Sequence, residues 1–192
     1  ILIVEDEEEL LNLMVKLLST EYNVYFASNG EEALKIVEQE EVDLIVTDVM
    51  MPVMNGIELC KTVKNQLDHS HIPVIMLTAK TAEEDRTEAY EVGADGYITK
   101  PFNLSVLHAR IKNLLRNKER RARDFNKSSV FELQDLNYTS LDEDFLKRAI
   151  DCVYKHLDDA DFDQPQMMDE IGASKSTLYK KLKSLTGLNP SA

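Results

Sequence analysis

The sequence predicts a doubly wound α/β domain with a five-stranded parallel sheet, followed by a small all-α domain. Short β-rich apolar runs alternate with amphipathic helical stretches throughout residues 1–116, and three of these runs are almost continuously apolar. Continuous apolar runs are expected of strands that are covered on both faces of a sheet. Regular alternation of strand and helix implies parallel strands with right-handed crossovers. After residue 141 the pattern is helical only.

The strands are expected in five short segments, which are residues 1–4, 24–27, 44–47, 74–78 and 96–99. Apolar residues recur at helical spacing between them, and a last helix follows the fifth strand from Leu104 to Leu115. A domain of this size and order is expected to have the flavodoxin-like (βα)5 topology. The ligand site of that topology lies at the carboxyl ends of the strands.

The composition is typical of a globular protein, with 43% hydrophobic and 30% charged residues. No apolar run approaches the roughly 20 residues of a membrane-spanning helix, so no membrane contact is expected. The start, Ile1 to Val4, has neither an initiator Met nor the charged flank of a signal peptide, and we interpret it as cut from a longer chain. Cys60 and Cys152 occupy apolar positions of helical patterns and are expected to be buried, reduced thiols, which suits the cytoplasm.

Charge is distributed unevenly along the chain. The formal net charge of −13 argues against nucleic-acid binding by the chain as a whole, because such binding depends on Lys and Arg. Beyond residue 140, however, every acid lies between Asp142 and Glu170. Four lysines follow without an acid among them, at Lys175, Lys180, Lys181 and Lys183. We therefore expect a small basic surface near the end of the sequence.

Residues 117–140 lack sustained periodicity and are expected to link the two domains. This segment opens with a basic cluster, Lys118, Arg120, Arg121 and Arg123. We interpret the cluster first as the solvated end of the preceding helix, and a role in binding nucleic acid is the alternative.

The all-α domain, residues 141–192, is predicted to contain three helices. The first spans 142–157, with Phe145, Ala149, Val153 and Leu157 on one face. Two shorter helices, at 164–171 and 174–185, are separated by Gly172 and Ala173. Two helices joined by so short a turn containing Gly are the signature of a helix-turn-helix, and Ser174 is a suitable N-cap for the second helix.

Three carboxylates are predicted to crowd the carboxyl edge of the sheet. Glu5 and Asp6 end the first strand, and Asp48 ends the third. Lys100, just after the fifth strand, is the compensating charge. Any one acid at a strand end is usually a solvated loop residue, but this set together predicts a bound cation. Carboxylate oxygens suit Mg²⁺, which commonly retains water ligands for a phosphate.

Five separated motifs, in order, accompany this acidic site. They are Glu5-Asp6, Asp48 with Met51-Pro52 and Asn55-Gly56 after it, Thr78-Ala79, Gly93 to Tyr97, and Lys100-Pro101-Phe102. Together they resemble the receiver domain of two-component response regulators, over residues 1 to about 116. The resemblance implies that Asp48 is the phosphoacceptor and that a histidine kinase, in the same chain or in trans, supplies the phosphoryl group.

The resemblance also implies roles for the residues around Asp48. Mg²⁺ would be bound by Asp48, by Asp6 directly, by Glu5 through water and by the backbone carbonyl of Met50. Many receivers have Asp where Glu5 stands, so this position departs modestly from the family pattern.

Two further residues follow from the same resemblance. Thr78 and Lys100 would stabilise the phosphoryl group, and Thr78 with Tyr97 would form the conformational switch. The phosphorylated form would dimerise through the fourth helix, fifth strand and fifth helix.

An enzyme that uses the same chemistry is the alternative from another class. Haloacid-dehalogenase-like phosphatases also form an aspartyl-phosphate with Mg²⁺, but they need a second Asp two residues after the nucleophile. Met50 occupies that position and cannot transfer a proton. The chain is therefore expected to be no enzyme beyond phosphorylation and slow dephosphorylation of its own Asp48.

The C-terminal segments 140–146, 173–179 and 186–191 resemble the start of the AraC-type DNA-binding domain. Combined with the receiver, they resemble the C-terminal end of hybrid two-component systems, where sensor, kinase, receiver and AraC-type module share a membrane-anchored chain. That module usually has two helix-turn-helix units, and one is present here.

The resemblance to the AraC-type module implies that the second helix of the turn enters the major groove of DNA. Ser176, Tyr179 and Lys180 would face bases, while Lys175 and Lys183 would meet phosphates. With a single unit, this chain is expected to bind DNA poorly by itself. The alternative is an output module that binds another protein and not DNA.

Overall fold

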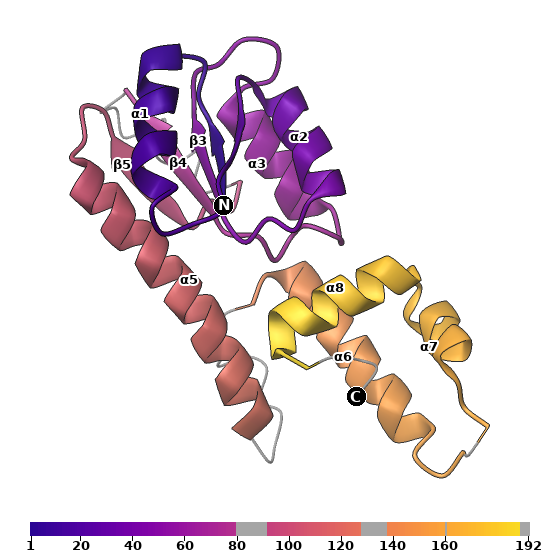
Figure 1. The fold of residues 1–192 in the computed structure, drawn as a ribbon. Helices are drawn as coiled ribbons and strands as arrows, with labels where there is room; N and C mark the ends of the chain where they lie inside the picture. The colour runs from indigo at the N-terminus through magenta and orange to yellow at the C-terminus, as the bar shows by residue number, and fades with distance from the viewer. Residues whose placement is uncertain (80–91, 128–137, 160, 189–192) are drawn as a thin grey trace. The chain divides into compact units, whose positions relative to one another are not determined.

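The computed structural model describes residues 1–79, 92–127, 138–159 and 161–188. The chain divides into two units, Ile1–Arg116 and Asn117–Ala192, which we call the α/β unit and the helical unit (Figure 1).

Five parallel strands form the sheet of the α/β unit, in the order β2-β1-β3-β4-β5. Their bounds are β1 Leu2–Val4, β2 Tyr25–Ala27, β3 Ile45–Asp48, β4 Val74–Thr78 and β5 Gly96–Thr99. The flavodoxin-like parallel fold predicted from the sequence is confirmed. Because the order places β1 beside β3, the ends of these two strands are neighbours.

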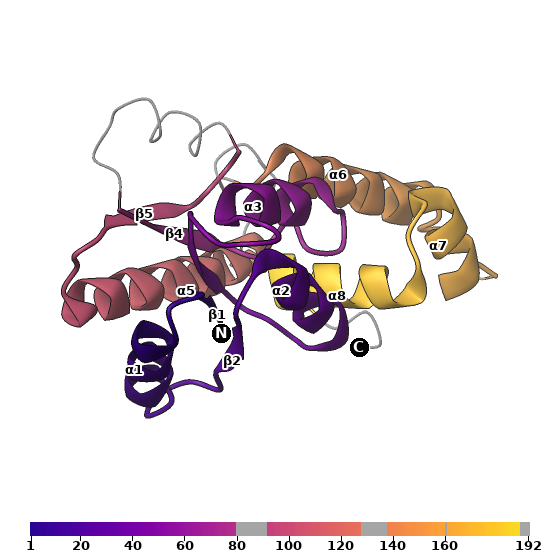
Figure 2. The same ribbon diagram turned by 90° about the horizontal axis from the view of Figure 1, so that it is seen from above.

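Helices cover both faces of the sheet, and the alternation of side chains along each strand supplies both cores (Figure 2). Leu2 and Val4 point to the face covered by α2 (Gly30–Gln39) and α3 (Gly56–Asn65). Ile3 points to the opposite face, covered by α1 (Glu8–Leu18) and α5 (Leu104–Lys127).

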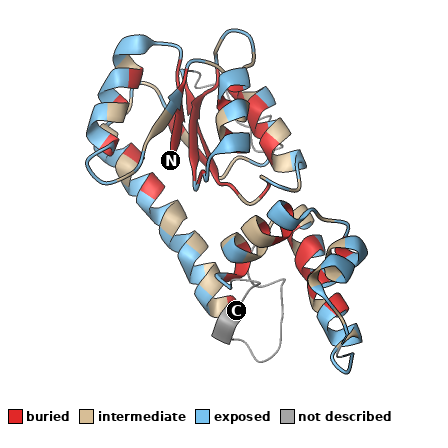
Figure 3. Ribbon diagram, turned by 45° about the vertical axis from the view of Figure 1, so that its right-hand side comes forward, coloured by how far each residue is buried: buried red, intermediate tan, exposed pale blue. Residues whose placement is uncertain are grey.

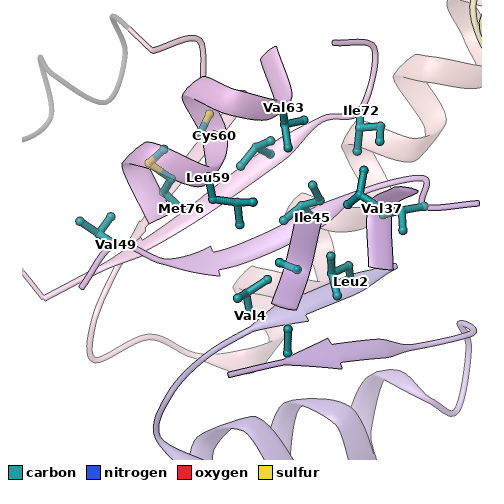
Figure 4. Close-up of a cluster of buried hydrophobic side chains, with 14 residues drawn as sticks. Leu2, Val4, Val37, Ile45, Val49, Leu59, Cys60, Val63, Ile72 and Met76 are labelled. Carbon is teal, nitrogen blue, oxygen red and sulfur yellow. The ribbon is translucent and has the colours of Figure 1, made fainter. Parts of the chain in front are cut away.

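The first of these cores is drawn in Figure 4, where Val37 of α2 and Leu59, Cys60 and Val63 of α3 meet the strands. Burial in the α/β unit is concentrated in the strands and in the inner faces of the helices (Figure 3). Residues 80–91, in which the fourth helix of the expected dimer face falls, lie outside the described residues.

Both cysteines are free and buried, as predicted. Cys60 is packed in the core of the α/β unit, where burial raises the pKa of its thiol to about 12. None of the helices in the described ranges is both long enough and apolar enough to cross a membrane.

The segment expected as a linker, 117–140, is helical over its first part, because α5 continues to Lys127. This agrees with the interpretation of the basic cluster as a helix end. Residues 128–137 of the segment lie outside the described residues.

The helical unit contains α6 (Ser140–Lys155), α7 (Gln164–Ile171) and α8 (Lys175–Thr186). Each helix is preceded by an N-cap residue whose side chain accepts a hydrogen bond from a backbone N–H of the first turn. These residues are Thr139, Asp163 and Ser174. Between α7 and α8, Gly172 takes a left-handed conformation with φ 69°, which ends α7 and allows the short turn.

The prediction of the apolar face of α6 is wrong at the C-terminal end of this helix. Phe145 and Ala149 are buried, but Val153 is 47% and Leu157 66% exposed. The buried stripe continues instead through Cys152, seven residues after Phe145. A step of seven residues keeps a side chain near the same face of a helix, whereas Val153 lies about 100° further round.

The basic surface predicted near the end of the sequence is corrected at Lys181. This side chain is 0% exposed and forms an ion pair with Asp142, whose side chain is 3% exposed. Lys181 follows Leu178 by three residues and therefore lies on the inward side of α8. The acid that neutralises it is 39 residues away in the sequence.

Candidate functional site

The predicted acidic residues and Lys100 come together at the carboxyl edge of the sheet. Carboxylate oxygens of Glu5, Asp6 and Asp48 lie within 4.8 Å of one another, an arrangement that could hold a metal ion. The Lys100 ammonium lies 2.6 Å from Asp48 Oδ2 and 2.7 Å from Glu5 Oε2. The ends of β1, β3 and β5 thus bring four charged side chains into one site.

Burial differs among these groups. Glu5 is 1% and Asp48 7% exposed, whereas Asp6 is exposed. Burial raises the pKa of Glu5 and the nearby Asp48 charge adds to this effect, while Lys100 opposes it. Burial alone would lower the pKa of Lys100, but its hydrogen bonds to Asp48 and Glu5 outweigh burial and raise it. The ammonium therefore remains charged and compensates the carboxylates.

The loop after β3 folds back over the end of its own strand. The Met50 amide donates to Asp48 Oδ1 at 3.2 Å, and the Gly56 amide donates to the Val49 carbonyl at 3.0 Å. A Cβ at Gly56 would lie 2.0 Å from the carbonyl oxygen of Asp48, so no side chain fits there. The sequence indicated Gly56 as part of a motif but did not predict its close approach to Asp48. The available signal was the Asn55-Gly56 pair, which is typical of a tight turn.

The same loop contains Val53 with φ 69°. A β-branched residue is rarely found in this left-handed region, because its side chain crowds the backbone. Val53 is 73% exposed, so burial of its side chain does not explain the conformation. Nothing in the sequence around Val53 indicated this left-handed conformation. The strain lies in the loop that positions the Asp48 carboxylate.

Thr78 lies on β4, which is next to β3, and Tyr97 lies on β5, which is next to β4. Thr78 ends β4 and is buried, and its carbonyl accepts a hydrogen bond from the Lys100 amide at 2.7 Å. Tyr97, on β5, is half-buried, with its hydroxyl 3.3 Å from Met76 Sδ. The end of β4 is thus joined through the backbone to the residue that carries the ammonium of the site.

The residues expected to contact DNA all lie on α8 of the helical unit. Lys175, Ser176 and Lys183 are exposed, and Tyr179 and Lys180 are partly exposed. Tyr179 accepts a 2.5 Å hydrogen bond from Gln164 Nε2 of α7. This contact fixes the tyrosine ring at the junction of the two helices.

Comparisons with known proteins agree with the architecture of the α/β unit. Residues 1–112 match the family model of the response regulator receiver domain. The receiver domain of a signal transduction histidine kinase from Syntrophus aciditrophicus superposes with a TM-score of 0.59 at 37% identity, covering 67% of this chain and 94% of that chain. The receiver domain of the Francisella response regulator 1452 gives a TM-score of 0.56 at 31% identity, covering 60% of this chain and 94% of that chain.

Two curated relatives are longer than this chain. The alkaline phosphatase synthesis transcriptional regulatory protein PhoP of Bacillus subtilis is 48% identical over 120 residues, which are 62% of this chain and 49% of PhoP. Histidine kinase P4 of Formosa agariphila is 39% identical over 190 residues, which are 99% of this chain and 14% of the kinase. Because the family model matches more than half of its residues, the chain belongs to the response regulator receiver domain family.

Proposed function

We propose that the α/β unit accepts a phosphoryl group on Asp48 from a histidine kinase and thereby controls a DNA-binding output in the helical unit. The observation that carries the first part is the convergence on Asp48. Its carboxylate is buried, 2.6 Å from the Lys100 ammonium, and surrounded by oxygens able to hold a metal ion.

The carboxylate of Asp48 would attack the phosphorus in line, forming an acyl phosphate as the bond from phosphorus to the donor breaks. Negative charge develops on the equatorial phosphoryl oxygens. The Lys100 ammonium and the Thr78 hydroxyl would stabilise that charge. The Met50 amide holds Asp48 Oδ1, leaving Oδ2 on the side of Lys100.

The donor set fits Mg²⁺, because it consists of carboxylate oxygens from three residues. Asp6 and Asp48 would hold the ion directly, Glu5 through water, and Met50 through its carbonyl. When bound, the ion would neutralise the phosphoryl oxygens. The proposed switch is a movement of Thr78 toward the phosphoryl group, followed by Tyr97. Since Met50 offers no general acid, hydrolysis of the acyl phosphate is proposed to be slow.

Phosphorylation by acetyl phosphate tests this proposal. In Mg²⁺ we expect one phosphoryl group per chain, mapped to Asp48 by mass spectrometry, and none in Asp48→Asn. Asp68→Asn, which changes an exposed acid of the same unit, should behave as wild type. A stoichiometric adduct on Asp48→Asn, or equal phosphorylation after treatment with EDTA, would show that the assignment is wrong.

Two observations support DNA binding as the output. The turn at Gly172 and Ala173 and the exposed lysines of α8 suit a recognition helix. The match to histidine kinase P4 continues through the helical unit, which supports a hybrid arrangement of kinase, receiver and output in one chain. The alternative is that this unit binds another protein.

A salt series on labelled DNA separates these outputs. If Lys175 neutralises a phosphate, Lys175→Gln should lower the slope of log K against log salt by about 0.9. Lys147→Gln, an equal change of charge on α6, should leave the slope unchanged. We expect dissociation constants of roughly 1 µM or weaker for this chain, since one helix makes few phosphate contacts. No salt-dependent binding, or equal slopes in both variants, would favour the protein-binding output.

A further inference from the structure

Three side chains of the helical unit form a cluster that the proposed function does not use. Cys152 and His156 lie one helical turn apart at the end of α6, and Glu170 lies on α7. One ligand atom of each lies within 4.8 Å of the others. Thiolate sulfur, imidazole nitrogen and carboxylate oxygen are the donors that Zn²⁺ binds in proteins, whereas Mg²⁺ takes oxygen ligands.

The His156 ring is held in one orientation by its neighbours. It stacks on Phe162, with the ring centroids 4.1 Å apart and the planes 5° from parallel. Its Nε2 lies 2.9 Å from Glu170 Oε2, and its Nδ1 lies 3.6 Å from Asp159 Oδ2. Metal-binding histidines usually have a carboxylate beside their second ring nitrogen, and Asp159 occupies that position here. The ring is therefore arranged to present Nε2 to the cluster.

Glu170 can serve two partners at once. Its Oε1 lies 2.5 Å from the Lys155 ammonium, while Oε2 faces His156. The Lys155 contact therefore leaves Oε2 for a ligand. Four further acids, Asp158, Asp159, Asp161 and Asp163, follow α6 and give this end of the unit a negative charge that attracts cations.

Cys152 is 2% exposed. Burial and the adjacent Glu170 both raise the pKa of its thiol, so the sulfur is protonated when no cation is bound. Coordination would transfer this proton to solvent and replace the contact between His156 and Glu170.

We propose that Cys152 Sγ, His156 Nε2 and Glu170 Oε2 bind Zn²⁺, with water as the fourth ligand. The three ligands come from α6 and α7, so the ion would fasten these helices together. Its binding would stabilise the helical unit directly, because the unfolded chain has no such preformed site.

Titration of the full chain with Co²⁺, and then with Zn²⁺, tests the proposal. Excess Mg²⁺ is present throughout to occupy the acidic site of the α/β unit. We expect one Co²⁺ per chain with a thiolate-to-cobalt charge-transfer band in the near ultraviolet, lost on addition of Zn²⁺. At a Zn²⁺ concentration about a hundred times the Kd, the Tm of the helical unit should rise by about 10–20 °C.

Variants of the cluster identify the ligands. Cys152→Ser should abolish the band, and His156→Gln should weaken binding at least about 100-fold. Asp159→Asn, which removes only the partner of Nδ1, should weaken binding by about 10-fold or more. Lys155→Gln is the matched control, because it alters the same helix and the same Glu170 but removes no ligand. It should bind at least as tightly as wild type.

Circular dichroism without metal checks that each variant keeps its helices. If one of the ligand variants loses its helices, Glu170→Gln takes its place, and it should also lose metal binding. Absence of a thiolate band in the folded wild-type chain, or its persistence in Cys152→Ser, would overturn the proposal. The proposal would also be overturned if Lys155→Gln lost as much metal binding as the ligand variants. That result would mean that binding depends on the ion pairs of the cluster and not on coordination by these three groups.

Discussion

Replacing Asp142 with alanine should destabilise the helical unit by about 3–5 kcal/mol, because it removes the buried carboxylate that forms an ion pair with the buried Lys181 ammonium. Lys181 is completely buried, and its Nζ lies 5.8 Å from the centroid of the Phe145 ring. The phenyl face offsets little of the charge once the carboxylate is removed. A loss of this size is a large fraction of the 5–15 kcal/mol that stabilises a typical domain, so much of the unit should unfold.

The measurement is urea unfolding of the full chain, with hydrogen exchange of the α6 and α8 amides to report the helical unit separately. Asp144→Ala is the matched control on the same helix. Asp144 is exposed and pairs with Arg148 at 3.3 Å, so its removal should cost no more than about 1 kcal/mol.

A double variant separates the effect of charge from that of packing. Asp142→Leu combined with Lys181→Met removes both charges and should recover most of the stability lost in Asp142→Ala, since apolar pairs often replace buried ion pairs at no cost. If Asp142→Ala lies within 1 kcal/mol of wild type, or the double variant is as unstable as the single one, the buried pair does not have this role.

Lys181 also shows where reading the sequence fails. The sequence gives the charge of each side chain, but a lysine among other lysines carries no local sign that it is buried. Its partner, Asp142, lies 39 residues away, and only the packing of α6 on α8 brings the two together. The exposure of Val153 escaped prediction for a similar reason, since the inward direction of α6 depends on what packs against it.

The α/β fold could be predicted because its signals are local. Apolar strands covered on both faces and helical periodicity each act within a few residues of the chain. The acidic site followed from one topological rule, that the carboxyl ends of parallel strands meet at one edge. The rule brought Glu5 and Asp48 together, although it could not give the contacts of Lys100 or the close approach of Gly56 to Asp48.

The cluster of Cys152, His156 and Glu170 could not be predicted from that rule, which applies to parallel sheets and not to packed helices. Cys152 and His156 are four residues apart at the C-terminal end of α6, which the sequence shows, but Glu170 is brought to them by the packing of α7 against α6. A pair of donors on a helix is common without a metal ion. Only the position of the third donor distinguishes this pair.

Lys100→Met should slow phosphorylation of Asp48 by about 100-fold or more, the cost of removing one group that stabilises developing charge in a reaction centre. In the same variant we expect Mg²⁺ to bind more tightly. The Lys100 ammonium contacts Glu5 and Asp48, the same carboxylates that would hold the ion, and a bound cation must compete with it. Without Mg²⁺ the pKa of Glu5 should rise further in this variant, because the hydrogen bond and the charge of Lys100 both lower it.

Two measurements check this prediction: the rate of phosphorylation by acetyl phosphate at saturating Mg²⁺, and the Tm with and without Mg²⁺. Lys64→Met is the matched control, because Lys64 forms a 2.8 Å ion pair with Asp95 in the same unit. That variant should lose stability equally in both conditions and keep the phosphorylation rate. In Lys100→Met, by contrast, stability lost without Mg²⁺ should return when the ion replaces the missing charge. A wild-type rate in Lys100→Met at saturating Mg²⁺ would mean that the ammonium compensates the carboxylates at rest but does not stabilise the transferred phosphoryl group.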